Sequence, residues 1–318
     1  MFKLTDLKAQ PVVSLCSVVI LLSLLCTVGA GDEDQDLPGP EKKTLKTKDG
    51  VALVCDYYPG NNGKETVPIL MVHGWGGVRG EFTNLARTLQ QDFGHAVIVP
   101  DLRGHGDSVR YTNLNGEEKL IDPKRMNRKE LAGMFQFDLE TVKKFLVRKN
   151  NEEKLNVDLL CIVGVQMGAI VGMNWAVLDW SWPALTGIKQ GQDVKAFVLV
   201  SPVQAFKGIR MQPALNHSKV RRLSTMILVG EKDRKGLKQA RQLNSSLKRF
   251  HLPAPGDSEE KAGTKSLFLV DFGTSLKGTK LLDAPVSNKN LGPHDWIAGF
   301  IQLRLQNKQD EHPWRKRG

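Results

Sequence analysis

Cysteine is scarce in this chain, with four in 318 residues. Cys16 and Cys26 fall within the first thirty residues, so a chain processed there would keep only Cys55 and Cys161. Both of these lie in apolar, strand-like runs, which predicts buried thiols and leaves a disulfide between them open. Neither has a base nearby in the sequence, so we do not expect a cysteine nucleophile.

The chain also lacks a long apolar run near its start. Pro11–Leu25 is shorter than the roughly 20 residues that a membrane-spanning helix needs. Lys3 and Lys8 precede this run, and the small residues Val28-Gly29-Ala30 follow it. This order is typical of a secretory signal, and an uncleaved N-terminal anchor is the rival interpretation. We therefore expect an exported protein that is periplasmic, envelope-associated or secreted, with residues 1–30 as the signal peptide.

Positive charge is in excess, with a formal net charge of +11 and an isoelectric point near 9.4. No nucleic-acid-binding motif accompanies this charge, so we do not expect nucleic acid as a partner. A solvated basic surface is the plainest explanation, and weak contact with anionic envelope polymers or lipid headgroups is the sharper one. The sequence leaves the oligomeric state open. The basic residues cluster at Lys42–Lys48, Lys219–Arg222 and Arg315–Arg317.

The remaining chain divides by composition into three parts. Residues 31–42 are acidic and rich in proline and glycine, which predicts a flexible leader. Residues 43–306 contain apolar segments throughout and are long enough for one large α/β domain. Residues 307–318 form a basic tail.

Strand-like and helix-like segments alternate along the domain. Asp49-Gly50 lies between two strand-like runs and predicts an N-terminal hairpin. The alternation after it predicts a mostly parallel sheet with helices on both faces. The apolar stripe of Arg128–Arg148 predicts one continuous helix. The core strands are expected at Val67–Val72, His95–Pro100, Val157–Val163, Val194–Val200, Thr225–Val229 and Ser266–Phe272.

One strand-to-helix turn has the spacing of a nucleophile elbow. Gly164-Val165-Gln166-Met167-Gly168 follows an apolar strand and precedes an apolar helix, as the G-x-S-x-G motif does. Glutamine stands where the motif has serine. A carboxamide is neutral and a poor nucleophile, and it has no ionisable group that a base could activate. The position that should identify the reaction therefore argues against it.

The order of these parts resembles the α/β-hydrolase superfamily, with esterases, lipases and serine-aminopeptidase-like enzymes as the closest members. The resemblance covers about Lys43 to Gln306. It depends on two loops after consecutive strands, on the degenerate elbow, and on the order of elbow, acid and histidine. The loops are His73-Gly74-Trp75-Gly76-Gly77 and Asp101-Leu102-Arg103-Gly104-His105-Gly106-Asp107-Ser108.

The resemblance implies an α/β-hydrolase fold with an eight-stranded, mostly parallel sheet. The family inserts its lid domains in the region of Val203–Leu223, which is short here, so we expect no large lid. The backbone N–H groups of Trp75 and Met167 would form the oxyanion hole. No cofactor and no metal are expected.

Carried over residue by residue, the resemblance assigns three further positions. Gln166 stands at the nucleophile position, Asp233 at the acid position and His294 at the base position. The residues themselves leave plainer roles open, because Asp233 could cap a helix and His294 could simply open the last one. Rival candidates are Glu231, Asp283 and Asp295 for the acid and His312 for the base.

The sequence supports three hypotheses about function. The first is a protein that lacks serine-hydrolase activity and binds a small-molecule, acyl or peptidic ligand in the former active-site pocket. The second is an ester or amide hydrolase in which His294 and Asp233 activate water directly. The third is a degenerate protein without a ligand, retained for structural or partner contacts.

Overall fold

The computed structural model describes residues 37–183, 185–187, 189–252, 263–285 and 291–318. Residues 36–252 and 266–318 form one compact body, whose fold is given below. The predicted signal peptide, residues 1–30, and the first half of the predicted leader, residues 31–36, lie outside the described residues. Within the described ranges, none of the helices has the length and apolar character that a membrane span requires.

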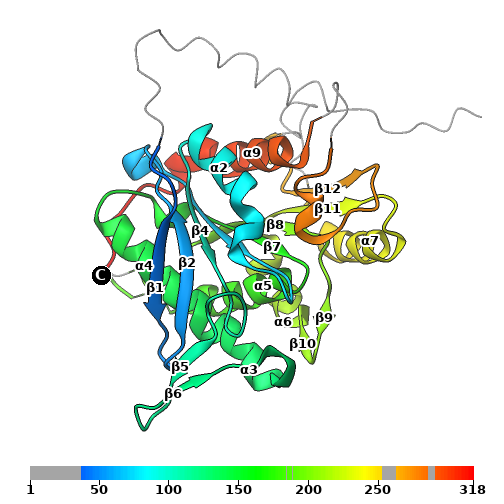
Figure 1. Ribbon diagram of the computed structural model, residues 1–318. Coiled ribbons are helices and arrows are strands. Elements are labelled where there is room, and N and C mark those ends of the chain that lie inside the picture. The colour runs from blue at the N-terminus through cyan, green and yellow to red at the C-terminus, as the bar shows by residue number, and fades with distance from the viewer. Residues whose placement is uncertain (1–36, 184, 188, 253–262, 286–290) are drawn as a thin grey trace, which may run out of the picture. The chain divides into compact units, whose positions relative to one another are not determined.

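The body is built on an eight-stranded sheet with the strand order β1-β2-β4-β3-β7-β8-β11-β12 (Figure 1). The first two strands form an antiparallel hairpin, and β2 also runs antiparallel to β4. All other pairs are parallel, which confirms the predicted mostly parallel sheet with an N-terminal hairpin. The bounds are β1 (Glu41–Lys46), β2 (Ala52–Tyr58), β3 (Pro68–Val72), β4 (Ala96–Pro100), β7 (Leu160–Val165), β8 (Val194–Val200), β11 (Ser224–Gly230) and β12 (Leu267–Phe272).

Helices cover both faces of this sheet, as predicted. Alternate residues of a strand point to opposite faces, so Leu70 and Val72 join one core while Ile69 and Met71 join the other. The first core includes α4 (Leu139–Asn151), α5 (Met167–Trp180) and α7 (Arg234–Lys248). The second includes α2 (Thr83–Gln91) and α9 (Pro293–Arg304), which lie together across the sheet in Figure 1.

Two small hairpins extend the loops at the carboxyl ends of the strands. One consists of β5 (Arg110–Thr112) and β6 (Glu118–Leu120), and the other of β9 (Ala205–Phe206) and β10 (Ile209–Arg210). Neither hairpin was predicted from the sequence. Between β8 and β11 the chain adds only the second hairpin and two short helical segments, α6 (Gln212–Asn216) and Val220–Arg222. This agrees with the expected lack of a large lid.

The helix predicted over Arg128–Arg148 is interrupted. It begins as α3 (Arg128–Gly133), widens into a π-helical turn at Met134–Asp138 and continues as α4. Asp138 at the end of that turn is fully buried and accepts hydrogen bonds from Nε and Nη2 of Arg103, at 2.9 and 2.7 Å. Periodicity alone predicted a regular helix because it does not register the buried ion pair at this turn.

The two described cysteines are free thiols. Cys55 belongs to one core and Cys161 to the other, so they lie on opposite faces of the sheet. Burial raises the pKa of both thiols, which keeps them protonated near neutral pH. The disulfide that the sequence left open is therefore not formed, and neither thiol is an activated nucleophile.

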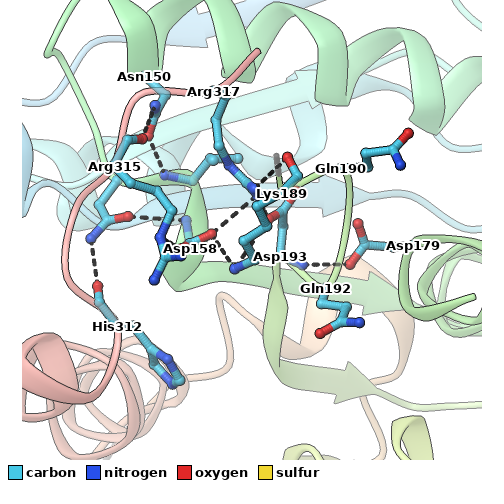
Figure 2. A network of polar contacts seen from close by, with 12 residues as sticks. Asn150, Asp158, Asp179, Lys189, Gln190, Gln192, Asp193, His312, Arg315 and Arg317 are labelled. Carbon is cyan, nitrogen blue, oxygen red and sulfur yellow. Dashed lines mark hydrogen bonds and ion pairs between the residues drawn. The ribbon is translucent and has the colours of Figure 1, made fainter. Parts of the chain in front are cut away.

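The chain after α9, which includes the predicted basic tail, folds back onto the body. The amide groups of Asn150 and Asn156 donate to the carbonyl oxygens of Arg315 and His312, at 3.0 and 2.9 Å. Asn151 both donates to and accepts from the backbone of Arg317. These contacts hold the C-terminal segment beside α4 (Figure 2).

Arg317 completes a buried network of opposite charges. Its guanidinium pairs with Asp193 and, at 3.1 Å, with Asp158, and all three side chains are at most 2% exposed. Lys189 lies 2.5 Å from Asp158, and Lys143 lies 3.2 Å from Asp193. Because a buried carboxylate is costly without a partner, the C-terminal segment contributes to the stability of the body.

We expect the substitution Arg317→Met to lower the free energy of unfolding by about 3 kcal/mol, because it leaves two buried carboxylates with fewer cations. Denaturant titration of both proteins measures this loss. Lys316→Met is the matched control, because Lys316 is exposed and its replacement should change stability by less than about 0.5 kcal/mol. Equal midpoints for the Arg317 and Lys316 variants would contradict the assigned role.

A buried histidine predicts a pH dependence of stability. His95 is fully buried at the start of β4, and neither ring nitrogen has a hydrogen-bond partner. Burial lowers the pKa of His95 from 6.5 to about 4. The unfolded chain therefore binds the proton more readily than the folded chain does. The contribution of neutral His95 to the free energy of unfolding is complete above pH 6.5 and is lost as the pH falls toward 4.

Comparison of the native chain with His95→Leu at pH 7 and pH 4 tests this pH dependence. The native chain should lose about 3 kcal/mol more than the variant over this interval. The two measurements at pH 7 serve as the control for packing changes. Parallel stability curves for the two proteins would show that His95 does not titrate in this way.

Candidate functional site

The predicted elbow is present as a strand, a one-residue turn and a helix. β7 ends at Val165, α5 begins at Met167, and Gln166 joins them with φ 49° and ψ −112°. A non-glycine residue with this positive φ is strained, and such residues persist only when the surrounding structure holds them. The backbone therefore has the sharp turn that raises the side chain at the apex above the sheet.

The two flanking glycines make this turn possible. A Cβ on Gly164 would lie 2.7 Å from Cα of Ala169 in the following helix. A Cβ on Gly168 would lie 2.2 Å from the carbonyl oxygen of Val72 at the end of β3. Both clashes involve backbone atoms that cannot move aside, so both positions require glycine.

Two loops approach the Gln166 side chain, and a residue after β8 holds one of them. A Cβ on Gly74, in the loop after β3, would lie 2.9 Å from Oε1 of Gln166. A Cβ on Gly278, in the loop after β12, would lie 3.4 Å from its Cδ and Nε2. Ser201, directly after β8, accepts a hydrogen bond of 3.1 Å from the backbone N–H of Gly278. The carboxamide thus fits a slot between two glycines and remains partly exposed.

Asp233 caps a helix. It is the N-cap residue of α7, and its side chain accepts a hydrogen bond of 3.1 Å from the backbone N–H of Gly236. Among the described residues, no hydrogen bond links Asp233 with His294. Asp233 therefore has the capping role that the sequence left open, and its assignment to the acid position stays a prediction.

His294 is the second residue of α9 and lies next to α2. Its Nδ1 is hydrogen-bonded to Oγ1 of Thr88 at 3.3 Å, while its buried Nε2 has no hydrogen-bond partner. Burial lowers the pKa of His294, and the carboxylates of Asp283 and Asp295 oppose this shift. Within the described part of the chain, no hydrogen bond connects His294 with Gln166.

The rival acids are also engaged locally. Asp283 accepts a hydrogen bond from Asn84 at 2.9 Å, and Asp295 accepts one from the backbone N–H of Gly292 at 2.8 Å. Asp295 thus closes the first turn of α9. Among the residues that the structure describes, no hydrogen bond joins the predicted nucleophile position, acid and base into the chain that a working triad requires.

Sequence reasoning missed the residue of the last loop that contacts Gln166. The sequence predicted a histidine there, whereas a Cβ on Gly278, between Lys277 and Thr279, would lie 3.4 Å from the Gln166 carboxamide. Thr279 donates a hydrogen bond of 2.8 Å to Glu81, which anchors this loop near the start of α2. The one available signal was a glycine soon after the last strand, where a loop can approach another backbone closely.

The loop that carries the predicted oxyanion hole is held by a buried histidine. Nδ1 of His73 donates to the carbonyl oxygen of Gly74 at 2.7 Å, so Nε2 accepts from the backbone N–H of Leu102 at 2.9 Å. Burial lowers the pKa of His73 to about 4, which keeps the ring neutral. Among the described residues, the N–H groups of Trp75 and Met167 donate no hydrogen bond.

Aromatic rings and a lysine surround Trp75. Its ring centroid lies 4.8 Å from that of His105 in an edge contact and 5.2 Å from that of Phe206. Nζ of Lys207 lies 3.9 Å from the Trp75 ring centroid, as in a cation–π contact. The wall beside the elbow is therefore apolar and carries a positive charge at its edge.

The described residues contain no group of three or more histidine, cysteine, aspartate or glutamate side chains that could hold a metal ion. A cavity of about 410 Å³ lies at the β5–β6 hairpin and the start of α3. No predicted site residue lines it. Its lining residues are Asp49, Val51, Arg103, Tyr111, Leu120, Ile121, Asp122, Arg125, Met126 and Glu130.

Comparisons with known proteins agree with this geometry. Over 70 residues the chain is 38% identical to Lipase 1 of Psychrobacter immobilis, a stretch that covers 22% of this chain and 20% of that lipase. An esterase of Pyrococcus furiosus has a similar structure, with a TM-score of 0.54, 16% identity and coverage of 87% of this chain and 96% of that one. An esterase of Pyrobaculum calidifontis gives a TM-score of 0.54 at 12% identity, covering 90% and 89%.

At 16% and 12% identity, the two solved structures show the fold alone. The sequence model of the alpha/beta hydrolase fold matches residues 67–263, which is more than half of the chain. That range includes the loop after β3, the elbow and the strand before Asp233. Since sequence and structure agree over these parts, the chain belongs to the alpha/beta hydrolase fold family.

Proposed function

We propose that this protein is an exported pseudoenzyme that uses the hydrolase fold to bind a ligand or partner at the elbow. The observation that carries the proposal is the glutamine at the strained apex, φ 49°, where the family presents its nucleophile. The backbone of the nucleophile elbow is present, and the serine hydroxyl is missing. Binding is the function that this combination supports best.

A carboxamide cannot perform the first step of serine hydrolysis. In that step a hydroxyl gives its proton to a histidine while its oxygen attacks the carbonyl carbon of the substrate. Gln166 has no hydroxyl and no proton that a neutral imidazole can remove. It offers instead one carbonyl acceptor and two N–H donors, a set that suits recognition of a polar ligand group.

The positions of the acid and the histidine support the same conclusion. The side chain of Asp233 accepts a hydrogen bond from the N–H of Gly236, and the ring of His294 is hydrogen-bonded to the hydroxyl of Thr88. A water-based mechanism would need these two residues to act together at the elbow. Neither residue is hydrogen-bonded to the other or to Gln166 among the described residues, which weighs against the alternative of an ester or amide hydrolase.

Export rests on the sequence. Lys3 and Lys8, the apolar run Pro11–Leu25 and the small residues before Gly31 together form the signal pattern. A net charge of +11 suits a protein that meets anionic surfaces outside the cytoplasm, by weak and salt-sensitive attraction. We accordingly assign the protein to the periplasm, the envelope or the medium.

We expect the native chain to show no ester hydrolysis and no labelling by a fluorophosphonate, because loss of a serine nucleophile costs about 10⁶-fold in kcat. The substitution Gln166→Ser should also remain unlabelled, since His294 bonds to Thr88 and not to the elbow. Release of p-nitrophenol from p-nitrophenyl butyrate and fluorescence of the labelled band measure both outcomes.

Gln166→Ala is the matched control, because it removes the carboxamide without adding a hydroxyl. An active serine esterase, assayed in parallel, verifies the reagents. Ester cleavage by the native chain that disappears in His294→Ala would overturn the proposal in favour of the water-based hydrolase. Labelling of the serine variant alone would show that a base reaches the elbow.

A further inference from the structure

Three cations gather at the β9–β10 hairpin without an acidic partner. Lys207 and Arg210 belong to the hairpin, and Cδ of Arg128 would lie 3.4 Å from a Cβ on Gly208. All three residues are exposed, and none of them forms an ion pair among the described residues. In contrast, the less exposed Arg79 and Arg103 pair with carboxylates. This rim therefore has positive charge that is not neutralised within the body.

The hairpin places Lys207 in a turn that disfavours lysine. Phe206 pairs with Ile209, so the loop consists of Lys207 and Gly208, with φ of 41° and 87°. Two positive φ values define a turn in which asparagine is strongly preferred at the first position. A side chain like lysine is strained there, and such strain is often found at ligand clamps. The turn fixes the direction in which the Lys207 side chain leaves the backbone.

That ammonium group is next to the elbow loop. Nζ of Lys207 lies 3.9 Å from the centroid of the Trp75 ring. Trp75 follows Gly74 in the chain. A Cβ added to Gly74 would lie 2.9 Å from Oε1 of Gln166. The lysine and the carboxamide therefore flank the same short loop, with the rings of Trp75 and Phe206 beside the lysine.

We propose that the ligand of the elbow is an organic carboxylate with an apolar body. The proposal rests on the binding function proposed above and specifies its ligand. Lys207 supplies the charge partner of the carboxylate, Nε2 of Gln166 donates a hydrogen bond to it, and the Trp75 and Phe206 rings contact the apolar body. A cationic ligand would meet the uncompensated charge of Lys207, Arg128 and Arg210.

Four probes of similar size separate the ligand classes: benzoate, benzamide, benzylammonium and phenyl phosphate. Ligand-observed NMR titrations of the full chain should give the tightest saturable binding for benzoate. Lys207→Met should weaken benzoate binding roughly fivefold and leave benzamide binding unchanged, because it removes the charge and keeps the apolar stem. Gln166→Ala should weaken the binding of both.

Two further variants separate binding from folding. Lys207→Asn suits the turn better than lysine does, so thermal unfolding should show equal or greater stability while the preference for benzoate is lost. Lys235→Met removes an exposed charge from α7 and should leave every titration unchanged. Destabilisation by Lys207→Asn would contradict the strained turn.

The outcomes separate the two proposals. Equal binding of benzamide, or tighter binding of phenyl phosphate or benzylammonium, would overturn the carboxylate assignment. If that binding still depended on Gln166, the proposed binding function would stand. Saturable binding of none of the four probes would overturn the carboxylate proposal, and ester cleavage that requires His294 would overturn the proposed function independently.

Discussion

The backbone of Gln166 is the constraint on which the site depends. Its strained turn costs on the order of 1–3 kcal/mol. β7 holds the turn on one side, because it pairs with β3 and β8, and α5 holds it on the other, because it begins at the next residue. Gly168 lets that helix approach the end of β3 at a distance no other residue allows. These contacts are independent of the side chain at 166, so the elbow persists without its serine.

The loss of the nucleophile is matched by its surroundings. Glutamine is longer than serine, and its carboxamide occupies a slot whose walls are Gly74 and Gly278. A triad needs an imidazole within hydrogen-bond reach of the apex. Here the loop after β12 presents a glycine to the apex, and the hydroxyl of Ser201 fixes that loop through the N–H of Gly278. The carboxamide is thus enclosed by the loops after β3 and β12.

The sequence predicted the sheet and the elbow because both leave local patterns. Apolar strands of five to seven residues between polar turns, together with two glycines at fixed spacing, need no long-range information. The position of His294 could not be predicted in this way. About twenty residues separate it from β12, so spacing does not decide which residue of that loop reaches the apex. The role of Asp233 could not be predicted either, because an aspartate at this position can serve as a helix cap or as the acid of a triad.

The buried ion pairs could not be predicted from the sequence for a related reason. Asp138 interrupts the predicted long helix, and Asp193 receives Arg317 from the far end of the chain. In each case the partner is distant in sequence, and burying a carboxylate requires that partner. Arg315 and Arg317 consequently pair with Asp158 of the body, although composition alone favoured a solvated basic surface for this cluster.

Lys207 differs from these paired charges. The body pairs its buried carboxylates with arginine and lysine, yet Lys207 lies against an indole ring in a turn that suits another residue. A cation fixed in this way has already lost part of its conformational freedom, so an anion that binds it has less entropy to overcome. A fixed ammonium beside an unreactive carboxamide favours holding an anion over attacking a carbonyl. The elbow and the strained hairpin therefore lie on either side of the loop that carries Gly74 and Trp75.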